Sequence, residues 1–295
     1  MPNLKKIILL LLVLQGALMA ASLREIEIKE SKIPVVFEEG EYIPIVSIQL
    51  VFRNAGHLYN TKDGLADMSA RLLNEGTAKD GSVGFATKLD AHAVDIAAHT
   101  GRETFVIEVS SLKSEFPYAV ERLEELLKDP NYTQEALEQI KHQKLGWLIQ
   151  KKSDFDYLAA TSLRATLFKG SALAKPYEGT IESIKSMTLE EIRTFLTTHL
   201  GYNNAIGVVG GDISFDEAKG YLTRLLSLFP KVEEREVQKI KASDKKEVVL
   251  THEDTHQGYI YFGAPFHYSY DAKDQHKAKI AEYLLGGAGF GSRLM

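Results

Sequence analysis

Hydrophobic and polar residues along the chain follow two different periods. A two-residue alternation or a β-branched run marks three early segments, and these predict strands over 24–29, 34–38 and 43–53. Apolar residues then recur at helical spacing at Leu65, Met68 and Leu72, and Gly76 ends the run. We therefore expect a helix over 64–74, directly after the longest of these strands.

The same two patterns continue through the middle of the chain. Small and apolar residues alternate over 87–96 and lead into a predicted strand region at 97–110 that turns at Thr100 and Gly101. Capping signals stand at Thr133, at Thr188 with Glu191 and at Ser214 with Glu217, and they place helix starts. Helices are predicted over 116–128, 134–151 and about 155–168, and a strand over 205–209.

A charged, apolar-poor stretch over 231–246 is typical of a linker. After it, strands are predicted over 247–251 and 258–263, a helix over 274–285, and a glycine-rich loop over 286–291. The order strand, loop, helix and glycine at 45–76 returns at 259–287, which indicates a duplicated unit. The predicted fold class is α+β, with a mostly antiparallel sheet packed against helices and a second, truncated copy. The expected division is a signal peptide at 1–21, a first domain at 22–230, the linker at 231–246 and the start of a second domain at 247–295.

Composition narrows the possible functions. Hydrophobic residues make up 44% of the 295 positions, which is typical of a folded protein with a sizeable core. A formal net charge of −5 argues against sequence-independent binding of nucleic acid, so no nucleic-acid partner is expected. Cysteine is absent, which excludes disulfides, thiolate zinc sites and cysteine nucleophiles. Any metal on this chain would have to bind His, Asp or Glu.

The N-terminus has the pattern of a secretory signal peptide. Lys5 and Lys6 precede an apolar run over 7–14, and small residues follow up to Ala20 and Ala21. The run is shorter than the roughly 20 residues of a membrane span, so we expect cleavage near Ala20 or Ala21 rather than a retained anchor helix. The predicted product is periplasmic or secreted, with no stable membrane insertion after cleavage.

One short motif matches a zinc-peptidase pattern. His252, Glu253 and His256 spell H-E-x-x-H, in which two histidines four residues apart share a zinc ion when they lie on a helix. The flanking segments have strand-like patterns, and in a strand the two histidines would lie roughly 13 Å apart. We therefore interpret the stretch as a polar bend between strands, with a zinc site at His252 and His256 as the alternative.

Several ordered segments together resemble the zinc peptidases that include pitrilysin, insulin-degrading enzyme and the mitochondrial processing peptidase. The matching segments cover nearly the whole chain after the N-terminal segment and are 52–56, 64–66, 75–77, 176–180, 182–184, 187–199, 208–212, 284–287 and 292–294. Catalytic members of that family carry H-x-x-E-H on the helix after Gly-Leu, with a distal Glu ligand about 75 residues on. Here the first histidine position is Asp67, the glutamate position is Ala70 and the second histidine position is Arg71.

The region of the distal ligand departs from the family pattern as well. It contains Lys144 and no carboxylate between Glu138 and Asp154. The resemblance therefore implies a member without a catalytic site or cofactor of its own, with zinc on a partner subunit. Asp67 and Arg71, four residues apart on one helix, are expected to form a surface ion pair.

The resemblance also implies a role for such a chain, because active subunits of the family often work with a similar subunit that lacks the zinc motif. Peptide contacts are then expected at Ala97, Ala98 and His99 on an edge strand, and in the loop at Gly286, Gly287, Gly289 and Gly291. An ordinary helix stop is the alternative for that loop. The predicted function is an exported non-catalytic subunit that binds an extended peptide and supports a catalytic zinc-peptidase relative. The alternatives are an autonomous zinc peptidase using His252, Glu253 and His256, and a peptide-binding scaffold with no peptidase partner.

Overall fold

The computed structural model describes residues 21–40, 42–237, 239–266 and 273–294. The predicted signal peptide therefore lies almost entirely outside the described residues. Within the described part, no helix has the length and apolar character needed to cross a membrane.

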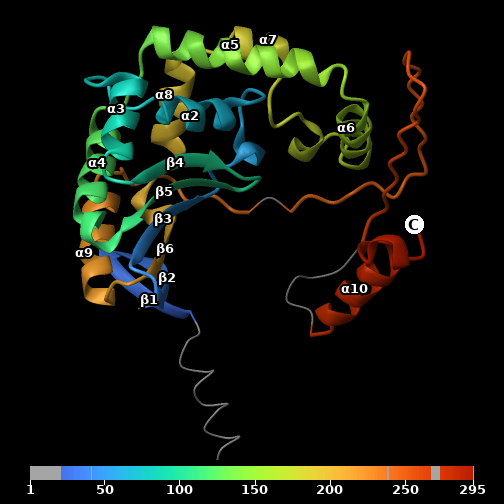
Figure 1. Cartoon of the computed structure of the whole chain (residues 1–295). Helices are drawn as coiled ribbons and strands as arrows, with labels where there is room; N and C mark the ends of the chain where they lie inside the picture. Colours follow the sequence, from blue (N-terminus) through green and yellow to red (C-terminus); the bar gives the residue numbers. More distant parts are fainter. Residues whose placement is uncertain (1–20, 41, 238, 267–272, 295) are drawn as a thin grey trace, which may run out of the picture.

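One six-stranded sheet forms the centre of the fold (Figure 1). Its strands lie in the order β1-β2-β6-β3-β5-β4, and only the β2–β6 pair is parallel. The strand bounds are Ser22–Ile28 for β1, Ser31–Glu39 for β2, Ile45–Arg53 for β3, Asp95–Thr100 for β4, Thr104–Leu112 for β5 and Ala205–Gly211 for β6. The prediction of a mostly antiparallel sheet is confirmed, and β4 lies at one edge.

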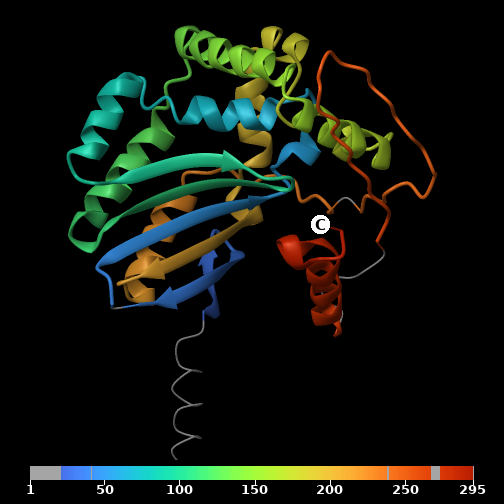
Figure 2. The same cartoon turned by 45° about the vertical axis from the view of Figure 1, so that its right-hand side comes forward.

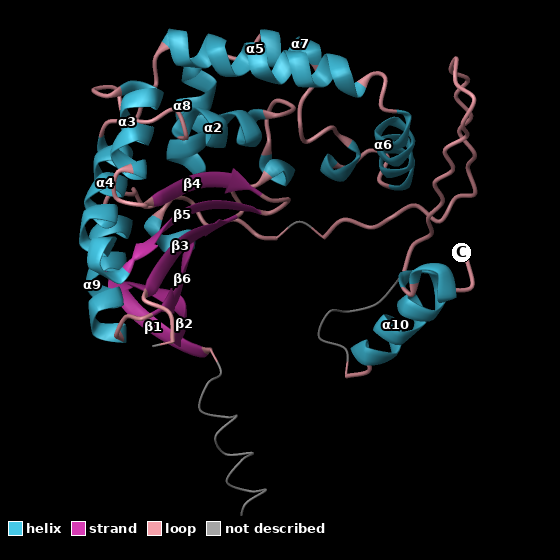
Figure 3. Cartoon of the chain, viewed as in Figure 1, coloured by secondary structure: helices cyan, strands magenta, loops and turns pink. Residues whose placement is uncertain are grey.

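Helices α2, α3, α4 and α9 pack against the sheet, and α10 lies apart from them, as Figures 2 and 3 show. The helix bounds are Leu65–Leu73 for α2, Gly81–Asp90 for α3, Phe116–Lys128 for α4, Gln134–Lys151 for α5, Phe155–Leu167 for α6, Ile181–Lys185 for α7, Leu189–His199 for α8, Phe215–Leu226 for α9 and Gln275–Glu282 for α10. Helices α2, α4 and α9 contact the strands directly, and α5 packs on α2. The α+β class is thus confirmed.

The core follows from the two-residue alternation of the strands. Ile48, Leu50 and Phe52 of β3 are fully buried beneath the helices. Ser47 and Gln49 point to the other face, where the Gln49 side chain donates a hydrogen bond to Glu108 of β5. One face of the sheet is therefore the apolar core. The other face is half-buried and mixed, since it carries Val51, Val106 and Val208 beside the polar pair.

One helix is absent from the sequence prediction, and one pair of predicted strands is wrong. Residues 87–96 do lead into β4, which begins at Asp95, but their first part belongs to the unpredicted helix α3, which ends at Asp90. Residues 247–251 and 258–263 form no strands, and Val248, Leu250, Ile260 and Phe262 are exposed. A strand needs a hydrogen-bonded neighbour, and none pairs with these segments in the described residues. A duplicated second sheet is therefore not shown.

Candidate functional site

The degenerate zinc-motif positions lie on α2, which is held by a tight turn. Gly64, just before the helix, has φ +83°, and a Cβ there would lie 2.8 Å from the Cα of Gly179. Only glycine fits this left-handed and crowded position. Asp67, Ala70 and Arg71 follow at spacings of three and four residues, so they share one side of the helix.

A lysine from α5 completes a three-residue ionic cluster at these positions. The Lys144 Nζ lies 2.8 Å from Asp67 Oδ2, and the Arg71 Nε lies 2.9 Å from the same oxygen. The Lys144 side chain is only 3% exposed, and its Nζ also lies 4.7 Å from the centre of the Trp147 ring. The predicted Asp67–Arg71 pair is confirmed. Lys144, in the region of the distal ligand, is a further partner of Asp67 that helical spacing does not predict, because it comes from another helix.

This cluster does not fit a zinc ion. Zinc needs lone pairs from His, Asp, Glu or Cys, and the ammonium of Lys144 and the guanidinium of Arg71 offer none. Ala70 has no group that could activate water. In the described part of the chain, no group of three or more His, Asp or Glu side chains is arranged to hold a metal. The cluster is therefore an ionic contact between α2 and α5.

The H-E-x-x-H residues lie elsewhere, in an exposed stretch without helix or strand. His252, Glu253 and His256 are all exposed, and a local turn joins the Thr255 N–H to the Glu253 carbonyl. Two histidines four residues apart share a metal when a helix stacks them, and the stretch is not helical. The expected flanking strands are absent here, as noted above, but the non-helical backbone agrees with the interpretation of a polar bend.

The expected peptide-binding residues Ala97, Ala98 and His99 lie on β4, at the sheet edge. The Ala98 backbone already has a partner: its N–H donates to Asn74 Oδ1 at 2.7 Å, and its carbonyl accepts from Asn74 Nδ2 at 2.9 Å. Backbone groups in an antiparallel ladder alternate in direction. Ile96 and Thr100 therefore also point to the outer edge, whereas Ala97 and His99 pair with β5.

Asn74 was missed because it follows the last turn of α2 and meets β4 only through the tertiary fold.

The structure does not bring β4 and the glycine-rich loop together. Gly286 and Gly287 lie in a π turn, Tyr283–Gly287, and Gly289 and Gly291 bound a short 3-10 turn. Both turns follow α10, which Figures 1 and 2 place apart from β4.

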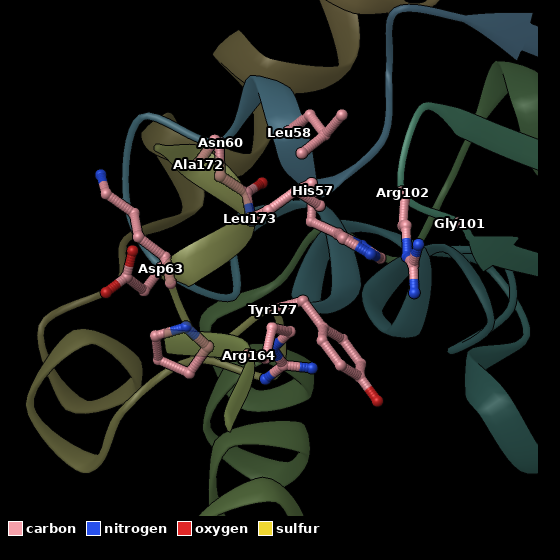
Figure 4. Close-up of a pocket in the computed structure, with 12 residues that line it drawn as sticks. His57, Leu58, Asn60, Asp63, Gly101, Arg102, Arg164, Ala172, Leu173 and Tyr177 are labelled. Carbon is pink, nitrogen blue, oxygen red and sulfur yellow. The ribbon is translucent and has the colours of Figure 1, made fainter. Parts of the chain in front are cut away.

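A cavity of about 310 Å³ lies beside the end of β4 (Figure 4). His57, Arg102, Arg164 and Tyr177 line it, and the His57 and Tyr177 rings stack with centres 4.8 Å apart. Burial, and then the charge of Arg102, lowers the pKa of His57 to about 4, so this imidazole is neutral at pH 7. Burial, with the Glu178 carboxylate, raises the pKa of Tyr177 to about 12. No spacing in the sequence points to this group of residues.

Comparison with known proteins identifies related sequences. Residues 34–181 match the insulinase (peptidase family M16) model, and residues 186–295 match the peptidase M16 inactive domain. The "Non-peptidase homolog YmxG" of Helicobacter pylori is 40% identical over 292 residues, which cover 99% of this chain and 67% of that protein. The mitochondrial-processing peptidase subunit beta of Dictyostelium discoideum is 26% identical over 185 residues, covering 62% of this chain and 39% of the relative.

Solved structures share the fold. A peptidase M16 inactive domain from Pseudomonas fluorescens superposes with a TM-score of 0.78 at 21% identity, covering 93% of this chain and 66% of that one. The periplasmic protease PqqL from Escherichia coli gives a TM-score of 0.65 at 17% identity, covering 76% and 26%. The chain thus spans at most about two thirds of these relatives.

Proposed function

The chain belongs to the M16 peptidase family as a non-catalytic member, and from this premise we propose that it is the exported subunit that binds peptide beside a zinc-bearing relative. The observation that carries the proposal is the Lys144–Asp67–Arg71 cluster. It puts two cations where a catalytic member needs metal ligands, and the position of the base is Ala70. The chain keeps the fold of a peptidase but lacks the zinc ligands and the base. A supporting role for a catalytic relative is consistent with the retained fold and with the lost zinc site.

Peptide binding is proposed at the outer edge of β4. An edge strand offers unpaired backbone groups to which an extended peptide adds as another strand. Here the outward groups belong to Ile96 and Thr100, and those of Ala98 are held by the side chain of Asn74. Asn74 is exposed, so an incoming peptide can displace its amide without opening the core. The glycine loop with Gly286, Gly287, Gly289 and Gly291 is proposed as a second peptide contact.

Export is proposed from the N-terminal pattern of Lys5, Lys6 and the apolar run that follows. The solved PqqL structure is described as a periplasmic protease, which is compatible with this location for a relative of the same fold. The partner is proposed to be a member of the same family that carries H-x-x-E-H, with zinc bound on that partner.

The test is to isolate the native protein under mild conditions, measure its zinc and identify the chains that accompany it. We expect a second chain with H-x-x-E-H, and zinc on that chain alone. A complex with no such chain would favour a scaffold without a peptidase partner.

A solitary protein with one zinc per chain would overturn the proposal if His252→Ala or His256→Ala removed the metal. His142→Ala is the matched control, because His142 lies on α5 outside the motif.

A further inference from the structure

The cavity beside β4 contains buried hydrogen-bond donors that have no acceptor. Within the described residues, Arg164 Nε and Nη2 are buried donors without a partner, and His57 Nδ1 is unpaired as well, as a donor or an acceptor according to the tautomer. The buried Glu178 Oε2, on the residue after Tyr177, is an unpaired acceptor, but the structure gives it no hydrogen bond to Arg164. Buried polar groups in native proteins are nearly always paired, so a cluster of unpaired donors on one cavity indicates a missing acceptor. Arg164 is on α6 and His57 on the short turn His57–Tyr59, so the tertiary fold brings them together.

The two unpaired Arg164 atoms have a specific geometry. Nε and Nη2 lie along the same edge of the planar guanidinium, and this edge holds a carboxylate through two parallel hydrogen bonds. The side chain is also held in place, because its guanidinium carbon lies 5.0 Å from the centre of the Tyr177 ring, which stacks on His57. Arg164 is thus a preorganised fork rather than a mobile surface charge.

The charge and shape of the cavity favour an anionic group with an apolar neighbour. Arg102, Arg164 and Lys175 line it, against the single carboxylate of Asp63 among the lining residues. Figure 4 shows Asp63 on the side of the cavity away from Arg102. The apolar part of the lining consists of Leu58, Ala172, Leu173, Pro176 and Tyr177. The anion would thus meet cations, and a side chain next to it would meet an apolar wall.

We propose that this cavity binds a peptide carboxylate, with Arg164 as its bidentate anchor. The inference rests on the proposed peptide binding at β4. Strand β4 ends at Thr100, and the next two residues, Gly101 and Arg102, line the cavity. We take the peptide to run parallel to β4, because this direction brings its carboxyl end to the cavity. The proposed group is therefore the terminal carboxylate rather than an Asp or Glu side chain.

The experiment compares three fluorescein-labelled nonapeptide libraries of random sequence by fluorescence anisotropy with the full chain. One library has free carboxyl ends, one is amidated, and one is amidated with Glu fixed in the last position. We expect the free-acid library to bind at least tenfold more tightly than the amidated one. If the Glu library matches the free-acid library, the carboxylate is recognised and its source is a side chain.

Variants distinguish this cavity from other sites. Arg164→Gln is expected to lower the affinity for the free-acid library about tenfold and to leave the affinity for the amidated library unchanged. Arg24→Gln, on the exposed edge strand at the opposite side of the sheet, is expected to change neither affinity. If Arg164→Gln does not fold, Arg102→Gln serves with the same expectation. Equal binding of free-acid and amidated libraries would overturn the carboxylate site and leave peptide binding intact. Binding of none of the libraries would overturn peptide binding by this chain, and the carboxylate site with it.

Discussion

At the scale of single residues, one carboxylate oxygen of Asp67 forms ion pairs with two cations, and these two side chains differ strongly in their exposure. Lys144 is 3% exposed at its side chain and Arg71 is 45% exposed. Asp67→Asn leaves a buried ammonium without its counter-charge, and we expect a loss of about 2–3 kcal/mol in the free energy of unfolding. Arg71→Gln removes only a solvated pair, with an expected loss of about 0.5 kcal/mol. Urea denaturation of both variants measures the difference.

A double variant checks that the unpaired charge is the cause. Lys144→Met added to Asp67→Asn removes the buried ammonium and keeps an apolar chain of similar length, so we expect most of the lost stability to return. A double variant less stable than Asp67→Asn alone would mean that Lys144 stabilises the fold chiefly by packing, for example on Trp147.

His57 gives a prediction for pH. Its pKa is about 4 in the folded chain, chiefly because of burial, against 6.5 for an ordinary histidine. Between these two values the unfolded chain binds a proton at His57 that the folded chain does not, so the free energy of unfolding falls as the pH falls from 6.5 towards 4. His57→Gln lacks this proton, and we expect its stability to fall less over that window. Urea denaturation at pH 7 and pH 5 compares the two proteins, and equal slopes would contradict the lowered pKa.

At the scale of elements, Asn74 connects the end of α2 to the edge strand β4 through two hydrogen bonds to Ala98. Asn74→Ala removes both, and we expect a loss of about 1 kcal/mol because the site is partly solvated. Hydrogen exchange at the Ala98 amide is expected to accelerate clearly, since its acceptor is gone.

Asn74→Asp is the matched control for that exchange measurement. It keeps an acceptor for the Ala98 N–H and loses the donor to the Ala98 carbonyl, so the amide should stay protected. Fast exchange in both variants would show that the contact between α2 and β4 depends on the carbonyl bond.

The elements also show what the sequence can predict. Strand β3 follows from the two-residue alternation of its buried face, and helix α2 from apolar residues three and four positions apart. Helix α2 is buried on all sides except that of Asp67 and Arg71. Residues 247–251 have a similar local pattern but find no neighbouring strand in the described residues, and periodicity contains no information about partners. Lys144, Asn74 and Arg164 act through contacts with residues far away in the sequence. Only the resemblance to a family directed attention to the position of Lys144, and nothing directed it to the other two.

At the scale of the whole molecule, the residues just after α9 still pack on the fold, since Phe229 contacts Phe52 and Val232 is buried. The described residues from 236 up to α10 run without helix or strand. Their contacts go mainly to α6 or just beyond it. The Ser243 N–H donates to the Leu167 carbonyl, Lys169 pairs with Glu247, the Tyr261 hydroxyl donates to Asp156, and the Tyr259 ring lies against Phe155. None of the described residues from 236 up to α10 belongs to the hydrophobic core cluster. We therefore expect the segment to open locally at much lower free energy than the core.

Limited trypsin digestion tests this expectation, because the segment carries exposed lysines at positions 239, 241, 245 and 246. A protease cleaves a backbone stretch of about ten residues that can lie extended in its active site. Helices and paired strands do not offer such a stretch, whereas this segment does. We expect the first cuts at these four lysines and a resistant fragment with unchanged circular dichroism per residue in the sheet and helices up to α9. Mass spectrometry locates the cuts. Such a fragment would support the proposed domain division near residue 230, whereas first cuts within α5 or α9 would mean that the core depends on the segment that follows it.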